Sequence, residues 1–95
     1  MERKIYVKAI ITVIGVDRIG IISEVSTLLA AEKVNILDIN QTILDDYFTM
    51  TMLVSLEKLE IPLDKLKKEL VQKGEKLGVS IRLQHEDIFR SMHRI

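Results

Sequence analysis

The stretch Gly15-Val16-Asp17-Arg18-Ile19-Gly20-Ile21-Ile22 decides the fold, because it joins two segments of different periodicity. Residues 5–14 before it are apolar and β-branched, as in a strand. Residues 21–33 after it repeat apolar side chains at helical spacing. The octet therefore predicts a strand-to-helix turn, in which Gly15 can adopt a positive φ and Asp17 can cap the helix.

Gly20 lies where the predicted helix begins, and two interpretations of it stay open. Without a Cβ, it would let a ligand approach the first turn, whose unpaired N–H groups favour a carboxylate or phosphate. Alternatively, the octet is only a tight turn. The helix that follows is expected to bury a stripe and to end at Val34-Asn35, with Asn35 as a left-handed closing residue. The expected stripe is Ile22, Val25 and Leu29, with Ile21 and Leu28 beside it.

The composition is that of a small globular domain. The chain has 95 residues, of which 47% are hydrophobic and 29% charged. Lys+Arg and Asp+Glu both number 14, so the net charge is zero and attracts neither nucleic acid nor an anionic membrane surface. Cysteine is absent, which excludes disulfides and thiol chemistry. No signal peptide or membrane-spanning run is visible, so we expect a cytoplasmic protein with no nucleic-acid or membrane partner.

The remaining chain predicts a hairpin, a second helix and a last strand. Alternating segments at 36–45 and 48–56 lie about a turn at Asp45-Asp46-Tyr47. Pro62 suits the start of a helix and Gly78 its end, before a short strand at 79–84.

The order of these elements predicts an α+β fold. A βαββαβ order is typical of the ferredoxin-like sandwich, a four-stranded antiparallel sheet with two helices on one face. We expect this domain to occupy residues 1–84. Residues 85–95 would form a C-terminal tail with the potential for a short helix.

Several of these residues together resemble the ACT domain family, a group of small-molecule-sensing regulatory modules. They are the turn G-x-D-x-x-G-I at 15–21, the segment Val34-Asn35-Ile36-Leu37-Asp38-Ile39, and Gln41-Thr42 leading into Phe48-Thr49-Met50. The chain is similar, more narrowly, to short standalone ACT proteins of the glycine-cleavage-repressor-like group. The resemblance covers residues 5–84 and implies a regulatory domain that senses a small molecule and is not an enzyme. The fold alone would not establish that function, because the same architecture occurs in proteins with many different functions.

The resemblance also implies a ligand site at the interface of a homo-oligomer, at least a dimer. The ligand, an amino acid by this resemblance, would lie between the turn after the first strand of one copy and the start of the second strand of another. Gly20 and Ile21 would offer backbone contacts, Asp17 would face an ammonium, and Asn35 with Ile36 would complete the pocket. The ligand-binding residues carried over are Asp17, Arg18, Ile19, Gly20, Ile21, Asn35 and Ile36.

The alternative function is a protein–protein interaction module of the same fold with no metabolite ligand. Asp17 would then be only a helix cap and Asn35 only a turn residue. A regulated protein partner is compatible with both functions. The face of the sheet away from the helices is expected to be half apolar, which suits a homomeric interface or a cover by the tail around Phe89.

Other chemistries fit the residues poorly, so we expect no catalytic residue, no metal site and no cofactor. An acylphosphatase-like site would need Arg18 and Asn40, but Asp17 would repel a phosphate there. An RNA-recognition module needs aromatic residues on the central strands, and only 4% of this chain is aromatic. The tail's His85 and His93, with Glu86 and Asp87, match no standard zinc spacing.

Overall fold

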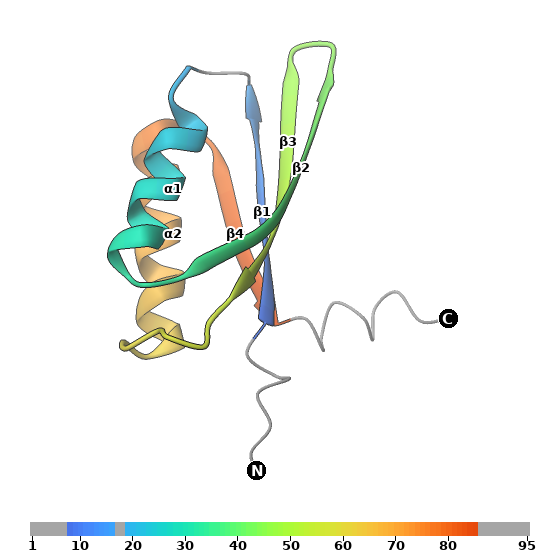
Figure 1. The fold of residues 1–95 in the computed structure, drawn as a ribbon. Coiled ribbons are helices and arrows are strands. Elements are labelled where there is room, and N and C mark those ends of the chain that lie inside the picture. The colour runs from blue at the N-terminus through green and yellow to red at the C-terminus, as the bar shows by residue number, and fades with distance from the viewer. Residues whose placement is uncertain (1–7, 17–18, 86–95) are drawn as a thin grey trace.

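A computed structural model describes residues 8–16 and 19–85 of the chain. In order, the elements are β1 (Lys8–Val16), α1 (Ile21–Ala31), β2 (Asn35–Leu44), β3 (Tyr47–Ser55), α2 (Leu63–Leu77) and β4 (Ser80–His85). The strands form one antiparallel sheet in the order β2-β3-β1-β4, and both helices lie against the same face of it (Figure 1). This confirms the predicted ferredoxin-like fold. The predictions made for residues 1–7, Asp17, Arg18 and the tail from residue 86 lie outside the described residues.

The hydrophobic core lies between the helices and every second residue of three strands. Apolar side chains that alternate along a strand point to one face, so β1, β3 and β4 each present a continuous apolar row to the helices. Each helix packs against these rows with a stripe of apolar side chains that are spaced three to four residues apart. The buried core is Ala9, Ile11, Val13, Phe48, Met50, Met52, Val54, Ile81 and Leu83 from the strands, Ile21, Val25, Leu29, Leu66 and Leu70 from the helices, and Val34.

Strand β2 is the exception, because no residue in it is buried. It forms one edge of the sheet, pairs only with β3, and carries a register shift between Ile36 and Asp38. Ile39 and Ile43 pair with the buried Met52 and Phe48, so they point to the helix side of the sheet. Their side chains nevertheless remain 38% and 58% exposed. The hairpin of β2 and β3 extends past the helices (Figure 1), which leaves this apolar row uncovered.

The turn after β1 is shorter than predicted. Gly15 and Val16 continue β1 and pair with Phe48 and Tyr47, and Gly15 does not have the predicted positive φ. Its lack of a side chain serves packing, since a Cβ there would lie 2.5 Å from Cγ1 of Val79. The N-cap position of α1 falls on Gly20, with φ of 93°, and not on Asp17 as predicted.

The other end of α1 also differs from the prediction. The helix ends at Ala31, and the left-handed residue that follows is Lys33, with φ of 64°, where Asn35 was expected. Asn35 instead begins β2. Within the helix, Ile21 takes the buried position expected for Ile22, which is 37% exposed. Val25 and Leu29 are buried as predicted, so the difference is confined to the first turn of the helix.

Helices α1 and α2 meet at a pair of carboxyl groups. A hydrogen bond with the Glu69 side chain raises the pKa of Glu32 above its ordinary value of 4.5, desolvation and the charge of Glu69 add to the rise, and Lys65 opposes it. A group whose pKa is higher in the folded state stabilises the fold at low pH, and that contribution is lost as the pH rises through the folded value.

We therefore expect Glu32→Gln, which keeps a hydrogen-bond donor at every pH, to lose less stability between about pH 4 and pH 7 than the wild type does. Urea unfolding midpoints at the two pH values measure this. Glu75→Gln, at an exposed position of the same helix as Glu69, is the control and should follow the wild-type profile. Parallel profiles for the wild type and Glu32→Gln would contradict the pairing.

No helix in the described ranges is both long and apolar enough to cross a bilayer.

Candidate functional site

The first half of the predicted site is the start of α1. Among the described residues, nothing lies within 4 Å of where a Cβ of Gly20 would be, so they leave the space beside the helix start open. No described side chain caps this helix, so its first-turn N–H groups keep their capacity to donate to an anion. Ile21 is 2% exposed and its side chain belongs to the core, so that side chain cannot line a pocket, whereas Ile19 is fully exposed. Asp17 and Arg18 lie outside the described residues.

The second half is the start of β2. Asn35 is exposed and pairs with Ser55 across the hairpin, and the half-buried Ile36 pairs with Val54. The Asn35 side chain offers both an amide donor and a carbonyl acceptor. An amide at this position can therefore accept from an ammonium group or donate to a carboxylate.

One chain does not bring the two halves together. Asn35 is level with Ser55 and Lys8, at the end of the sheet where β1 begins. Val16 lies at the other end of β1, about 26 Å away for a nine-residue strand. The chain enters α1 from the Val16 end, so Gly20 and Asn35 lie at opposite ends of the helix (Figure 1). A pocket that uses both needs a second polypeptide.

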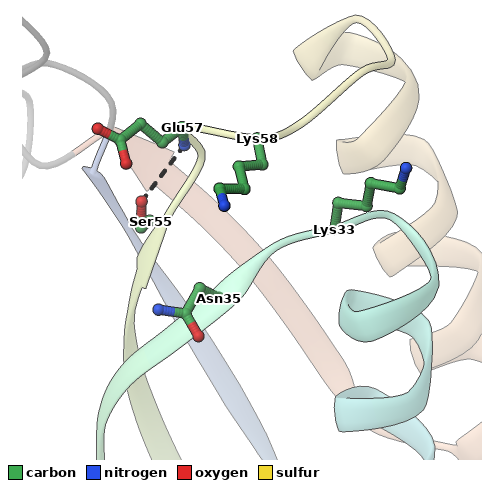
Figure 2. Close-up of a pocket in the computed structure, with 5 residues that line it drawn as sticks. All are labelled: Lys33, Asn35, Ser55, Glu57 and Lys58. Carbon is green, nitrogen blue, oxygen red and sulfur yellow. Dashed lines mark hydrogen bonds between the residues drawn. The ribbon is translucent and has the colours of Figure 1, made fainter.

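A hollow of about 380 Å³ lies beside Asn35. It is lined by Lys33, Asn35, Ser55, Glu57 and Lys58 (Figure 2). Of these, the sequence predicted only Asn35 as a site residue. The others come from the helix-to-strand turn, the end of β3 and the connection after it, and only the Asn35–Ser55 register brings them together. No sequence signal marks them, because the charged connection at residues 57–61 looks like any solvated loop.

Some of the polar and charged groups around this hollow have hydrogen-bond or ion-pair partners, and others do not. Nζ of Lys33 lies 3.5 Å from Oε1 of Glu60 in an exposed ion pair. The backbone N–H of Glu57 donates to Oγ of Ser55 at 3.3 Å, which leaves the hydroxyl hydrogen of Ser55 available. Within the described part of the chain, the ammonium group of Lys58 has no hydrogen-bond or ion-pair partner.

Within residues 8–16 and 19–85, no three His, Cys, Asp or Glu side chains are grouped so that they could hold a metal ion. The tail residues Glu86, Asp87 and His93 lie outside the described residues. The lining of the hollow consists of hydrogen-bonding and charged side chains.

Comparison with known proteins gives the family. The ACT domain model matches residues 8–84. A UPF0237 protein of Clostridium acetobutylicum is 59% identical over 88 residues, which cover 93% of this chain and 99% of that protein. An ACT domain protein from Streptococcus pneumoniae is 44% identical, with a TM-score of 0.77, over 86% of this chain and 92% of that one. A candidate glycine cleavage system transcriptional repressor is 26% identical, with a TM-score of 0.69, over 82% of this chain and 44% of that one. The chain belongs to the ACT domain family, whose members are regulatory ligand-binding domains.

Proposed function

We propose that this protein is a regulatory sensor of a free amino acid, which binds where two copies of the chain meet. The observation that supports this most directly is the separation of the two half-sites. The open helix start at Gly20 and the polar residue Asn35 lie at opposite ends of α1, and Asn35 begins the uncovered edge strand β2.

An antiparallel pair of β2 strands would bring the half-sites together. A twofold axis through the middle of β2 reverses the partner strand, so Asn35 of one copy comes beside the Leu44 end of the other. That end is level with Val16, where the chain leaves β1 for α1. The edge offers unpaired backbone groups, and Ile39 and Ile43 offer apolar area to bury. Two equivalent pockets would result.

The chemistry of the joined pocket suits a zwitterion. The N–H groups of the first turn of α1 would donate to the carboxylate, and the carbonyl oxygen of Asn35 would accept from the ammonium. Each hydrogen bond to a charged group is worth roughly 1.5–3 kcal/mol. A few of them supply about 4–8 kcal/mol, which corresponds to dissociation constants from millimolar to micromolar.

A thermal and urea unfolding screen of the wild-type protein with free amino acids tests this function. A ligand held at 100 times its dissociation constant should raise the free energy of unfolding by about 2.7 kcal/mol. A response to no amino acid, at concentrations up to tens of millimolar, would overturn the proposal.

Gly20→Val is expected to abolish the amino-acid response. Gly20 has φ of 93°, a conformation that a valine rarely adopts, so the substitution disturbs the helix start at which the ligand carboxylate would bind. Isothermal titration calorimetry with the amino acid found in the screen measures the loss.

Gly78→Val provides a control for backbone strain. Gly78 has φ of 77° and closes α2, so a valine there strains the chain to a similar degree in a different loop. We expect that variant to lose stability and to keep its affinity. If Gly20→Val bound the amino acid as tightly as Gly78→Val, the helix start would not be part of the pocket.

A second candidate function is a protein-interaction module without a metabolite. The face of the sheet away from the helices supports it, since Ile14 is 47% and Val16 54% exposed there. The two functions differ in the screen, because an interaction module would respond to no amino acid.

A further inference from the structure

We propose that the ligand carries a second anionic group, which Lys58 binds, so that the sensor is selective for an acidic amino acid. The inference rests on the proposed function, because Lys58 lines the same hollow as Asn35. It adds the chemical class of the ligand, which neither half-site alone specifies.

The lysine is placed to reach the ligand. Figure 2 shows the Lys58 side chain extending from the connection after β3 toward the strand pair that carries Ser55 and Asn35. Its ammonium group has no partner among the described residues. The hydroxyl of Ser55 also donates to no described residue, and its oxygen accepts from the backbone N–H of Glu57. An ammonium and a hydroxyl at one hollow favour a carboxylate.

The other charged residues around the hollow point elsewhere. Figure 2 shows the Lys33 ammonium and the Glu57 carboxylate turned away from the space between Lys58 and Asn35. Lys33 already pairs with Glu60. With two lysines and one glutamate, the lining carries a formal charge of +1. The glutamate charge therefore does not cancel the attraction of Lys58 for an anion.

The backbone groups of the ligand already have partners in the proposed pocket, so Lys58 is left to bind its side chain. In the proposed pocket, the helix start of one copy takes the α-carboxylate and Asn35 of the other takes the α-ammonium. A ligand with an apolar side chain would cover the Lys58 ammonium without replacing its water, which is unfavourable, and an amide oxygen would replace that water only with an uncharged acceptor. A side-chain carboxylate would replace that water with a charge-assisted hydrogen bond.

The test compares L-glutamate with L-glutamine, which have nearly the same shape and differ in one charge. Calorimetric titration of the wild-type protein should show glutamate binding at least about tenfold more tightly. In Lys58→Met, the affinity for glutamate should fall to about that for glutamine, while the affinity for glutamine should change much less. Lys33→Met removes one charge from the same lining, and it should keep most of the preference because Lys33 faces Glu60. A parallel titration with inorganic phosphate should show no competition at matched concentration.

Each contrary result has a distinct meaning. Equal binding of glutamate and glutamine by the wild type would overturn the inference and leave the amino-acid sensor standing. A preference that survives in Lys58→Met, or equal losses in Lys58→Met and Lys33→Met, would show that Lys58 makes no direct contact. Phosphate competing with glutamate would mean a general anion site and would also overturn it. Binding of no amino acid at all would overturn the proposed function together with the inference.

Discussion

Ile43→Lys is expected to be a folded monomer that no longer responds to amino acids. Ile43 lies on the helix side of β2, yet it is 58% exposed in the single chain, so a lysine there remains solvated when the protein is monomeric. In an antiparallel β2 pair, both copies carry the lysine, and each lysine side chain would be covered by the partner. Covering an unpaired ammonium costs several kcal/mol, so we expect the dimer to weaken by at least about a hundredfold.

Sedimentation velocity over a range of protein concentrations measures the change, and calorimetry of the same sample measures the loss of ligand binding. Val71→Lys is the matched control, because Val71 is 47% exposed on α2, away from the β2 edge. It should associate and bind like the wild type. A monomeric wild-type protein that still binds an amino acid would contradict the shared pocket, as would an Ile43→Lys variant that dimerises normally.

Gly74→Ala is expected to destabilise the protein, although helix propensity alone predicts the opposite. Gly74 is buried within α2, and in an exposed helix the change to alanine would add about 1 kcal/mol. Here a Cβ would lie 2.7 Å from the carbonyl oxygen of Val79 and 3.2 Å from Cγ1 of Ile81. The backbone of Val79 cannot easily retreat, since its N–H donates to the Gly74 carbonyl at 2.9 Å. Overpacking of this kind costs about 1–3 kcal/mol, so after the helix-propensity gain we expect a net loss of up to about 2 kcal/mol.

Urea unfolding at neutral pH measures this loss as a lower midpoint at an unchanged slope. Gln72→Ala, at an exposed position of the same helix, should change stability by less than about 0.5 kcal/mol. A Gly74→Ala variant more stable than the wild type would show that α2 and the start of β4 can move apart, and that the close approach at Val79 is not a constraint.

The role of Gly15 could not be predicted from the sequence. Gly15 was expected to act through local backbone freedom in the turn, and it instead makes room for Val79, as Gly74 does. Val79 is remote from Gly15 in the chain, so nothing local to Gly15 predicts that contact. The contact with Gly74 is local, because Val79 follows the end of α2 and its N–H donates to the Gly74 carbonyl. Gly20, in contrast, has a positive φ that belongs to the turn itself.

The candidate site likewise contains residues that the sequence could predict and residues that it could not. Gly20 and Asn35 were recognisable because they belong to short motifs beside element boundaries. Ser55 and Lys58 were not, because they join Asn35 only through the pairing of β2 with β3. The exposure of the apolar row at Ile39 and Ile43 was also not predictable, since their alternation is the same as that of a buried strand.

The sequence by itself determined the order of strands and helices, the alternating core rows and the family, because these depend on periods of two and 3.6 residues and on short motifs. The tertiary structure alone decided that Gly15 is needed for packing, that β2 is left uncovered, and that Ser55 and Lys58 lie beside Asn35 at one hollow. Those properties depend on strand register and on contacts between residues distant in the chain, which local patterns do not encode.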